Sequence, residues 1–160
     1  MTREEEIQDS LIKKFNFLEN KIRVQRQKRI FAEVPSENFL EIFEYAVEDL
    51  GFKFICTITG LDEGSSLAFI YHITRQDGIT LNLKITVPKE HPVIKTVMQF
   101  FPGADIYERE VMDLLGAKVE GLPAGKRYPL PDDWPAGQYP LRKDWKKPEK
   151  AKGKEETQNA

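Results

Sequence analysis

The chain has 160 residues, and its 24 Lys and Arg against 26 Asp and Glu give a formal net charge of −2, which excludes a protein whose whole surface binds nucleic acid. One cysteine, Cys56, and two histidines exclude an internal disulfide, a cluster held by several cysteines and most histidine-based metal sites. No apolar run approaches the roughly 18 residues that cross a bilayer. The acidic N-terminus lacks the apolar stretch of a secretory signal, so we expect a cytoplasmic protein.

Two amphipathic helices are predicted before residue 52. The first follows a capping box formed by Thr2 and Glu5 and repeats apolar residues at helical spacing as far as Leu18. The second is expected to begin at Ser36 and to close at Gly51, because glycine favours the left-handed conformation that follows a helix. Its apolar stripe consists of Phe39, Leu40, Phe43, Val47 and Leu50.

Four strands are predicted from alternating apolar and polar residues. A short run over 30–34 ends at Pro35, and three longer runs cover 52–58, 67–73 and 79–87. A tight hairpin signal separates the last two runs. We therefore expect an α+β fold, a two-layer sandwich with a mostly antiparallel four-stranded sheet and helices on one face.

The cysteine and the histidines are expected to have no chemical role. Cys56 is in phase with Phe52, Phe54 and Ile58, so it is interpreted as a small core residue rather than a nucleophile. His72 falls on the polar phase of its strand, and His91 lies in a loop before a proline.

A short helix around 94–100 and a longer one over 106–115 are predicted next, and the longer one carries the densest polar cluster of the chain. Glu110 and Asp113 share a helix face, and Arg109 can pair with Asp113 four residues on. The carboxylates could form an acid/base pair or a hard-cation site. We prefer a structural interpretation, because no nucleophile or cofactor motif accompanies them. In that interpretation they meet the basic residues Lys126, Arg127, Arg142 and Lys143.

The chain changes character after residue 121. Residues 122–145, here called the C-terminal strip, hold both tryptophans and two of the five tyrosines among closely spaced prolines. The prolines exclude regular elements, and the aromatic residues argue against disorder. An extended strip laid on a surface fits both features, the surface being its own domain or a partner. The expected division is a core domain over 1–121, a docking segment over 122–145 and a disordered charged tail over 146–160.

These residues carry a resemblance. Residues 101–116, FPGADIYEREVMDLLG, resemble the signature of the 30 kDa subunit family of complex I, the NADH-quinone oxidoreductase. Residues 130–134, LPDDW, with 139–144, YPLRKD, are similar to the C-terminal motif of that family, and 59–62, TGLD, also resemble it. The family usually has Gly-His-Pro-Asp and paired arginines between these blocks, where this chain keeps only Lys126-Arg127. With this departure the chain resembles the divergent homologues of the family in membrane-bound energy-converting nickel–iron hydrogenases and ferredoxin-linked sulfur-reducing complexes.

The resemblance implies a non-catalytic accessory subunit in the hydrophilic arm of a membrane-anchored, complex I-related redox complex that couples electron transfer to ion pumping. It implies no metal and no cofactor in this chain, with iron–sulfur clusters, and nickel–iron in the hydrogenases, in partner subunits. The implied partners are a large subunit like that of hydrogenases (49 kDa-like), an iron–sulfur small subunit and other members of the complex, with no nucleic acid. Membrane contact is then indirect, at the cytoplasmic side.

Two groups of residues are expected to serve assembly. The signature group consists of Tyr107, Glu108, Arg109, Glu110, Asp113 and Gly116. The docking group consists of Lys126, Arg127, Trp134, Tyr139, Pro140, Leu141, Arg142, Lys143 and Asp144. We expect the C-terminal strip to leave the domain and to become ordered only against the large subunit.

Three alternatives remain open. One is the 30 kDa subunit of an oxidoreductase that transfers electrons from NADH or another donor to quinone. Another is a stand-alone enzyme that uses Glu108, Glu110 and Asp113. The last is a binding module in which the lysines of 146–154 contact nucleic acid or anionic lipid.

Overall fold

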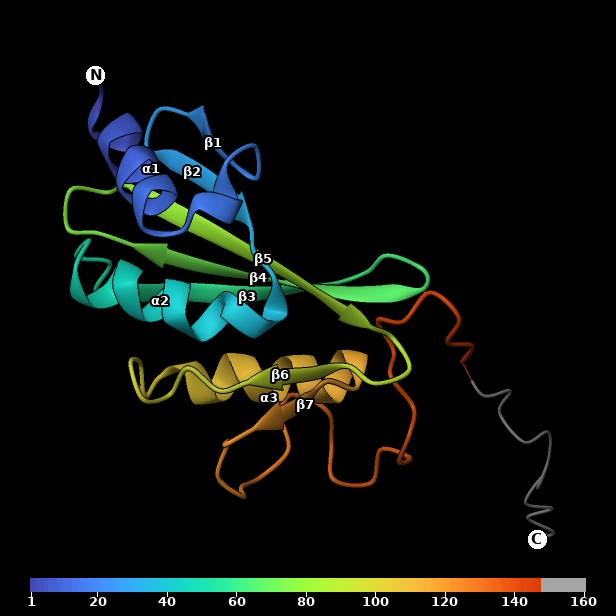
Figure 1. The fold of residues 1–160 in the computed structure, drawn as a ribbon. Helices are drawn as coiled ribbons and strands as arrows, with labels where there is room; N and C mark the ends of the chain where they lie inside the picture. The colour runs from blue at the N-terminus through green and yellow to red at the C-terminus, as the bar shows by residue number, and fades with distance from the viewer. Residues whose placement is uncertain (148–160) are drawn as a thin grey trace, which may run out of the picture.

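The computed structural model describes residues 1–147 and shows a central sheet covered by three helices (Figure 1). The helices are α1 (Arg3–Lys14), α2 (Phe39–Glu48) and α3 (Ala104–Leu115). The strands are β1 (Ile22–Arg26), β2 (Arg29–Glu33), β3 (Phe54–Asp62), β4 (Ser66–Thr74), β5 (Thr80–Pro88), β6 (Val93–Lys95) and β7 (Lys118–Glu120). Short 3-10 turns, η1 (Asn16–Leu18) and η2 (Ser36–Asn38), precede β1 and α2. The charged tail predicted over 146–160 lies, from residue 148 on, outside the described residues.

The main sheet has the strand order β1-β2-β5-β4-β3. Neighbouring strands in this sheet are antiparallel except for β2 and β5. These two run parallel because the chain between them crosses over through α2 and the β3–β4 hairpin. The prediction of an α+β fold with a mostly antiparallel sheet is confirmed, with one strand more than expected. The additional strand, β1, is basic and lies at the sheet edge, so only Ile22 of its five residues is buried and the alternation is weak.

All three helices pack on one face of the sheet. On α2, Phe39 and Phe43 contact Tyr71 of β4, with ring centroids 4.5 and 5.9 Å apart. On α3, Leu115 lies directly over Gly60 of β3, on the same face as Tyr71. A Cβ at position 60 would collide with Leu115, so the missing side chain lets α3 approach the strand. Phe15, at the end of α1, packs edge-on against the ring of Tyr45 in α2.

Some of the expected helix boundaries are present and others are displaced. The capping box of Thr2 and Glu5 is present at α1, and Gly51 follows α2 with a φ of +77°. Ser36 does not cap α2, because η2 precedes the helix and α2 begins at Phe39. The short helix expected around 94–100 is instead strand β6 followed by a turn, since Ile94 pairs with Val119 of β7.

Cys56 is exposed, which corrects its interpretation as a core residue. A β-bulge between Ile55 and Thr57 shifts the register of β3 against β4 by one residue. The bulge turns the start of the strand over, so Phe54 is 53 % exposed while Ile58 remains buried.

Candidate docking surface

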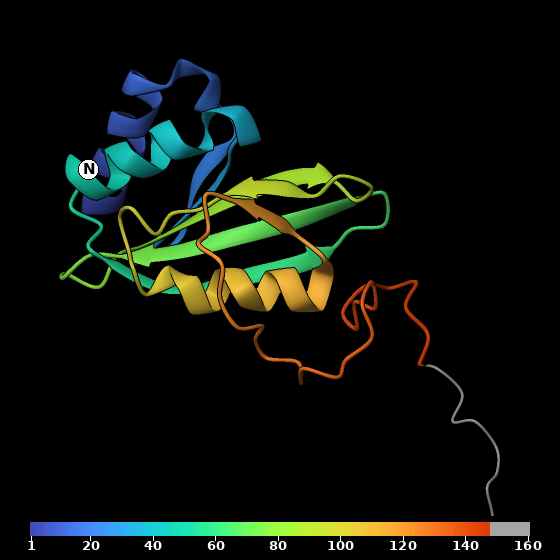
Figure 2. The ribbon, with the colours of Figure 1, turned by 90° about the horizontal axis from the view of Figure 1, so that it is seen from below.

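The C-terminal strip runs past α3 on the side away from the sheet and returns at the C-terminal end of that helix (Figure 2). It forms no helix or strand, as its prolines predict. Contrary to the expectation that it leaves the domain, it makes hydrogen bonds to α3, β3 and the segment after β5. The physical reason is that the domain offers two carboxylates and the free carbonyls of a helix end as partners for the strip.

Asp113 on α3 holds the first part of the strip. Its carboxylate accepts hydrogen bonds from Arg127 Nε at 3.2 Å and from the Leu130 backbone N–H at 3.1 Å. Arg127 also donates to the Trp134 carbonyl at 3.0 Å. The expectation that the acidic helix meets downstream basic residues is thus met at Asp113, whose partner is Arg127 and not Arg109.

Asp62, at the end of β3, holds the last part of the strip. Its Oδ2 accepts hydrogen bonds from Lys89 Nζ at 2.7 Å and from the Lys143 backbone N–H at 2.8 Å. Lys89 also donates to Asp144 at 3.0 Å. The Asp62 side chain is only 1 % exposed, and the hydrogen bond from Lys89 lowers its pKa to about 2. The hydrogen bonds of Lys89 raise its own pKa, the bond to Asp62 more than the bond to Asp144.

The end of α3 is covered by the strip. Gly116 closes the helix with a φ of +76°, and its Cα faces the Tyr139 ring so closely that a Cβ would lie 2.6 Å from the nearest ring carbon. Leu141 N–H donates to the Leu114 carbonyl at 3.0 Å, and Arg142 Nε donates to the Leu115 carbonyl at 2.7 Å. These bonds satisfy carbonyls that a helix end leaves free.

Glu108 is fully buried, but it has no basic partner. It accepts hydrogen bonds from the Thr96 hydroxyl and the Val97 N–H, both at 2.7 Å. Burial raises the pKa of Glu108. It therefore joins α3 to the segment after β6, which corrects the expectation that an Arg or Lys holds it.

The structure also shows the positions of the other signature residues on α3. Arg109 pairs with Asp105, one turn earlier, and donates to the Pro123 carbonyl at 2.8 Å, so the expected pair with Asp113 does not form. Glu110 and Tyr107 are half-buried on α3.

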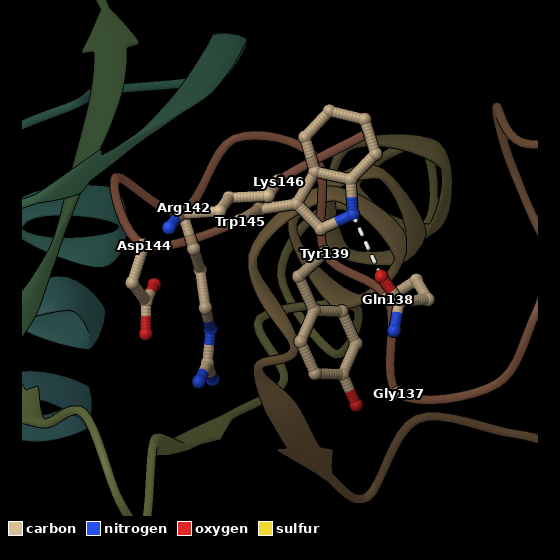
Figure 3. A pocket seen from close by; sticks show the side chains of 7 residues that line it. All are labelled: Gly137, Gln138, Tyr139, Arg142, Asp144, Trp145 and Lys146. Carbon is tan, nitrogen blue, oxygen red and sulfur yellow. Dashed lines mark hydrogen bonds between the residues drawn. The ribbon is translucent and has the colours of Figure 1, made fainter. Parts of the chain in front are cut away.

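Both tryptophans lie together at the outer end of the strip. The rings of Trp134 and Trp145 are stacked, with centroids 6.0 Å apart. Gln138 holds both, since its carbonyl accepts from Trp134 Nε1 at 2.8 Å and its side-chain oxygen accepts from Trp145 Nε1 at 2.9 Å. Figure 3 shows the second bond, with Arg142 beside Tyr139 and its guanidinium carbon 4.8 Å from the ring centroid.

The remaining docking residues are exposed or half-buried. Lys126 and Lys143 are exposed, Pro140 is half-buried, and Leu141 is 55 % exposed although its backbone is bonded to α3. The sequence analysis did not identify Asp62 and Lys89 as partners of the strip, nor Gln138 as the residue within the strip that holds both tryptophans. For Asp62 there was one signal, its place in the TGLD run that resembles the family.

Within residues 1–147, no group of three or more His, Cys, Asp or Glu side chains is placed to hold a metal ion. None of the helices in that range is both long and apolar enough to cross a membrane. His72 is hydrogen-bonded between Thr59 at 2.9 Å and Asn82 at 2.6 Å on the sheet face away from the helices.

The fold and the surface define a class of protein: a small α+β domain whose aromatic C-terminal strip is fastened across its last helix. The chain belongs to the family of the 30 kDa subunit of respiratory-chain NADH dehydrogenase, whose model matches residues 32–151. The resemblance predicted from residues 101–116 and 130–144 is thereby confirmed.

Individual relatives support the same assignment. The chain is 34 % identical over 140 residues to a subunit of the F(420)H(2) dehydrogenase of Methanosarcina mazei, covering 86 % of this chain and 88 % of that protein. It is 32 % identical over 126 residues to the beta subunit of the membrane-bound hydrogenase of Pyrococcus furiosus, covering 75 % of this chain and 72 % of that protein. Among solved structures, it matches a chain of the membrane-bound sulfane sulfur reductase, an archaeal respiratory membrane complex, with a TM-score of 0.77 and 27 % identity over 91 % of this chain and 86 % of that one.

Proposed function

We propose that this chain is a non-catalytic accessory subunit of a membrane-anchored, complex I-related redox complex of the hydrogenase or sulfur reductase type. The observation that carries the proposal is that the polar side chains next to the strip serve to hold the strip on the domain. Asp62, Asp113, Arg127 and Arg142 are engaged in fastening the C-terminal strip, and none is left free to serve as an acid, a base or a metal ligand. The names of the hydrogenase and sulfur reductase relatives supply the type of complex.

The strip supplies the proposed contact with the large, catalytic-type subunit. Tyr128 at 43 % and Ile106 at 45 % exposure line one hollow beside the strip, and Leu141, 55 % exposed, lies at the C-terminal end of α3. Exposed large apolar side chains of this kind are typical of protein interfaces. In this proposal the redox cofactors lie in the partner subunits, and the chain reaches the cytoplasmic side of the membrane through them.

The test compares the isolated chain with the assembled complex. The chain expressed alone is expected to bind no stoichiometric iron or nickel and to show no hydrogenase, sulfur reductase or quinone reductase activity. A tag on the same chain in its native cells is expected to isolate a complex that contains iron and a large subunit. Metal analysis and identification of the co-purified proteins by mass spectrometry check both arms. Turnover by the isolated chain, or recovery of the tagged chain without other subunits, would contradict the proposal.

A further inference from the structure

The stacked pair of Trp134 and Trp145 borders two hollows of different character. One is almost entirely apolar and is lined by the two rings, Pro135, Gln138 and the stem of Lys147. The other lies against Trp145 on the side of Tyr139 and Arg142 and also takes in Lys146 (Figure 3). Trp145 and Gln138 line both, so a ligand could fill the two hollows together.

The charges around these hollows are predominantly positive, although the whole chain is weakly negative. Residues 142–147 contain four basic side chains and one acidic one, Asp144, which lines the second hollow and is paired there with Lys89. Lys146 and Lys147 are exposed and line one hollow each. Asp132 and Asp133 precede Trp134 in the strip, but neither lines a hollow.

We propose that the two hollows bind one short segment of the partner subunit, in which an apolar side chain stands next to Asp or Glu. The apolar side chain fits the apolar hollow that borders Trp134 and Trp145, and the carboxylate fits the side of Arg142 and Lys146. Tryptophan and arginine are the residue types that most often dominate interface energies. This inference rests on the proposed function, because it assumes that the strip meets another subunit.

The site is already formed in the isolated chain. Gln138 fixes both indole N–H groups, Arg127 holds the Trp134 carbonyl, and Asp62 holds the backbone at Lys143. A partner segment would therefore meet ordered side chains and would not have to order the strip on binding. A formed site lowers the entropic cost of association.

A photoreactive amino acid at position 136 tests the chemistry of the occupant. Ala136 is exposed and lies between Pro135 and Gly137, which each line one of the hollows. The full-length variant is assembled into the complex in native cells, irradiated and analysed by mass spectrometry. We expect a cross-link to a peptide of another subunit with an apolar residue within two positions of Asp or Glu. Position 76, in the turn between β4 and β5, is the control and should not give this cross-link.

Charge reversal provides a second readout. Lys146→Glu with Lys147→Glu is expected to weaken association of the chain with the complex about tenfold, and more at low salt than at high salt. Lys13→Glu with Lys14→Glu changes the net charge equally at the far end of α1 and should leave association unchanged.

The outcomes separate the inference from the proposed function. A complex that retains the chain but gives cross-links from position 136 only to lipid, to this chain or to a segment without carboxylates would overturn the inference alone. An absence of any salt-dependent difference between the two lysine pairs would also overturn it. Recovery of the chain without other subunits would instead overturn the proposed function.

Discussion

Asp62 shows how much a single carboxylate can organise. Its two oxygens accept hydrogen bonds from Lys89, the Lys143 backbone and the Gly64 backbone, so it joins the end of β3 to residues 27 and 81 positions away in the sequence. These donors favour the ionised form and lower the pKa of Asp62 to about 2 from an ordinary 3.8. The strip is therefore fastened most firmly when Asp62 carries its charge.

Asp62→Asn is expected to reduce the free energy of unfolding at pH 7 by about 2 kcal/mol, because charge-assisted hydrogen bonds to a buried group are lost. The pKa in the folded state lies below that in the unfolded state, so this contribution is present above pH 4 and disappears as pH falls towards 2. Urea unfolding of both proteins between pH 7 and pH 2 checks this, and the two curves should converge at the acid end. Asp133→Asn, which changes an exposed carboxylate of the same strip, should have little effect at any pH. A constant difference for Asp62→Asn across the range would show that its charge is not responsible.

At the scale of elements, α3 connects the sheet to the strip. One side of the helix packs on Gly60 through Leu115 and Val111, and its C-terminal carbonyls accept hydrogen bonds from the strip. Gly116 is essential to this arrangement for two reasons, its positive φ and the contact of its Cα with the Tyr139 ring. Gly51, three residues beyond the end of α2, has almost the same φ of +77°, but it has open space around it.

This difference predicts unequal effects of one substitution. Gly51→Ala should cost about 1 kcal/mol, the strain of placing a side chain in the left-handed region. Gly116→Ala should cost at least about 1 kcal/mol more, because the added methyl group displaces Tyr139. Both tryptophans lie in the strip, so their fluorescence should change in Gly116→Ala and stay constant in Gly51→Ala. Equal costs and unchanged spectra would mean that the strip does not depend on Tyr139.

The elements also show what the sequence could predict. The alternation over 79–87 predicted a strand with one apolar face, and Leu81, Leu83 and Ile85 of β5 are buried in the core, because a strand covered on one face has a period of two. No such signal marks the bulge at Cys56. The extra residue changes which face of the sheet the side chains before it occupy, but the residue types in the sequence do not show this change. The fastening of the strip was equally hidden, because Asp62 and Lys143 are neighbours only after the sheet and α3 are in place.

At the scale of the whole molecule, the sheet, the helices and the strip form successive layers, and the strip is the outermost on the side of α3. The helices cover one face of the sheet, and the strip then covers α3 (Figures 1 and 2). The exposed aromatic and basic side chains of the strip lie on the outside of this last layer. The family of this chain, named for a subunit of the respiratory-chain NADH dehydrogenase, agrees with the proposal that this outer surface contacts another subunit.

The most direct test of the proposed docking role is the recovery of the chain in its complex when Leu141 is changed to Glu. Leu141 is 55 % exposed and bonds to α3 only through its backbone, so the domain should fold normally while association with the large subunit is lost. Phe54→Glu is the matched control, since Phe54 is 53 % exposed at the start of β3 and outside the strip. The measurement is the amount of each variant that co-purifies with a tagged large subunit. A docking role for the strip predicts loss for Leu141→Glu and full recovery for Phe54→Glu, and the reverse pattern would contradict it.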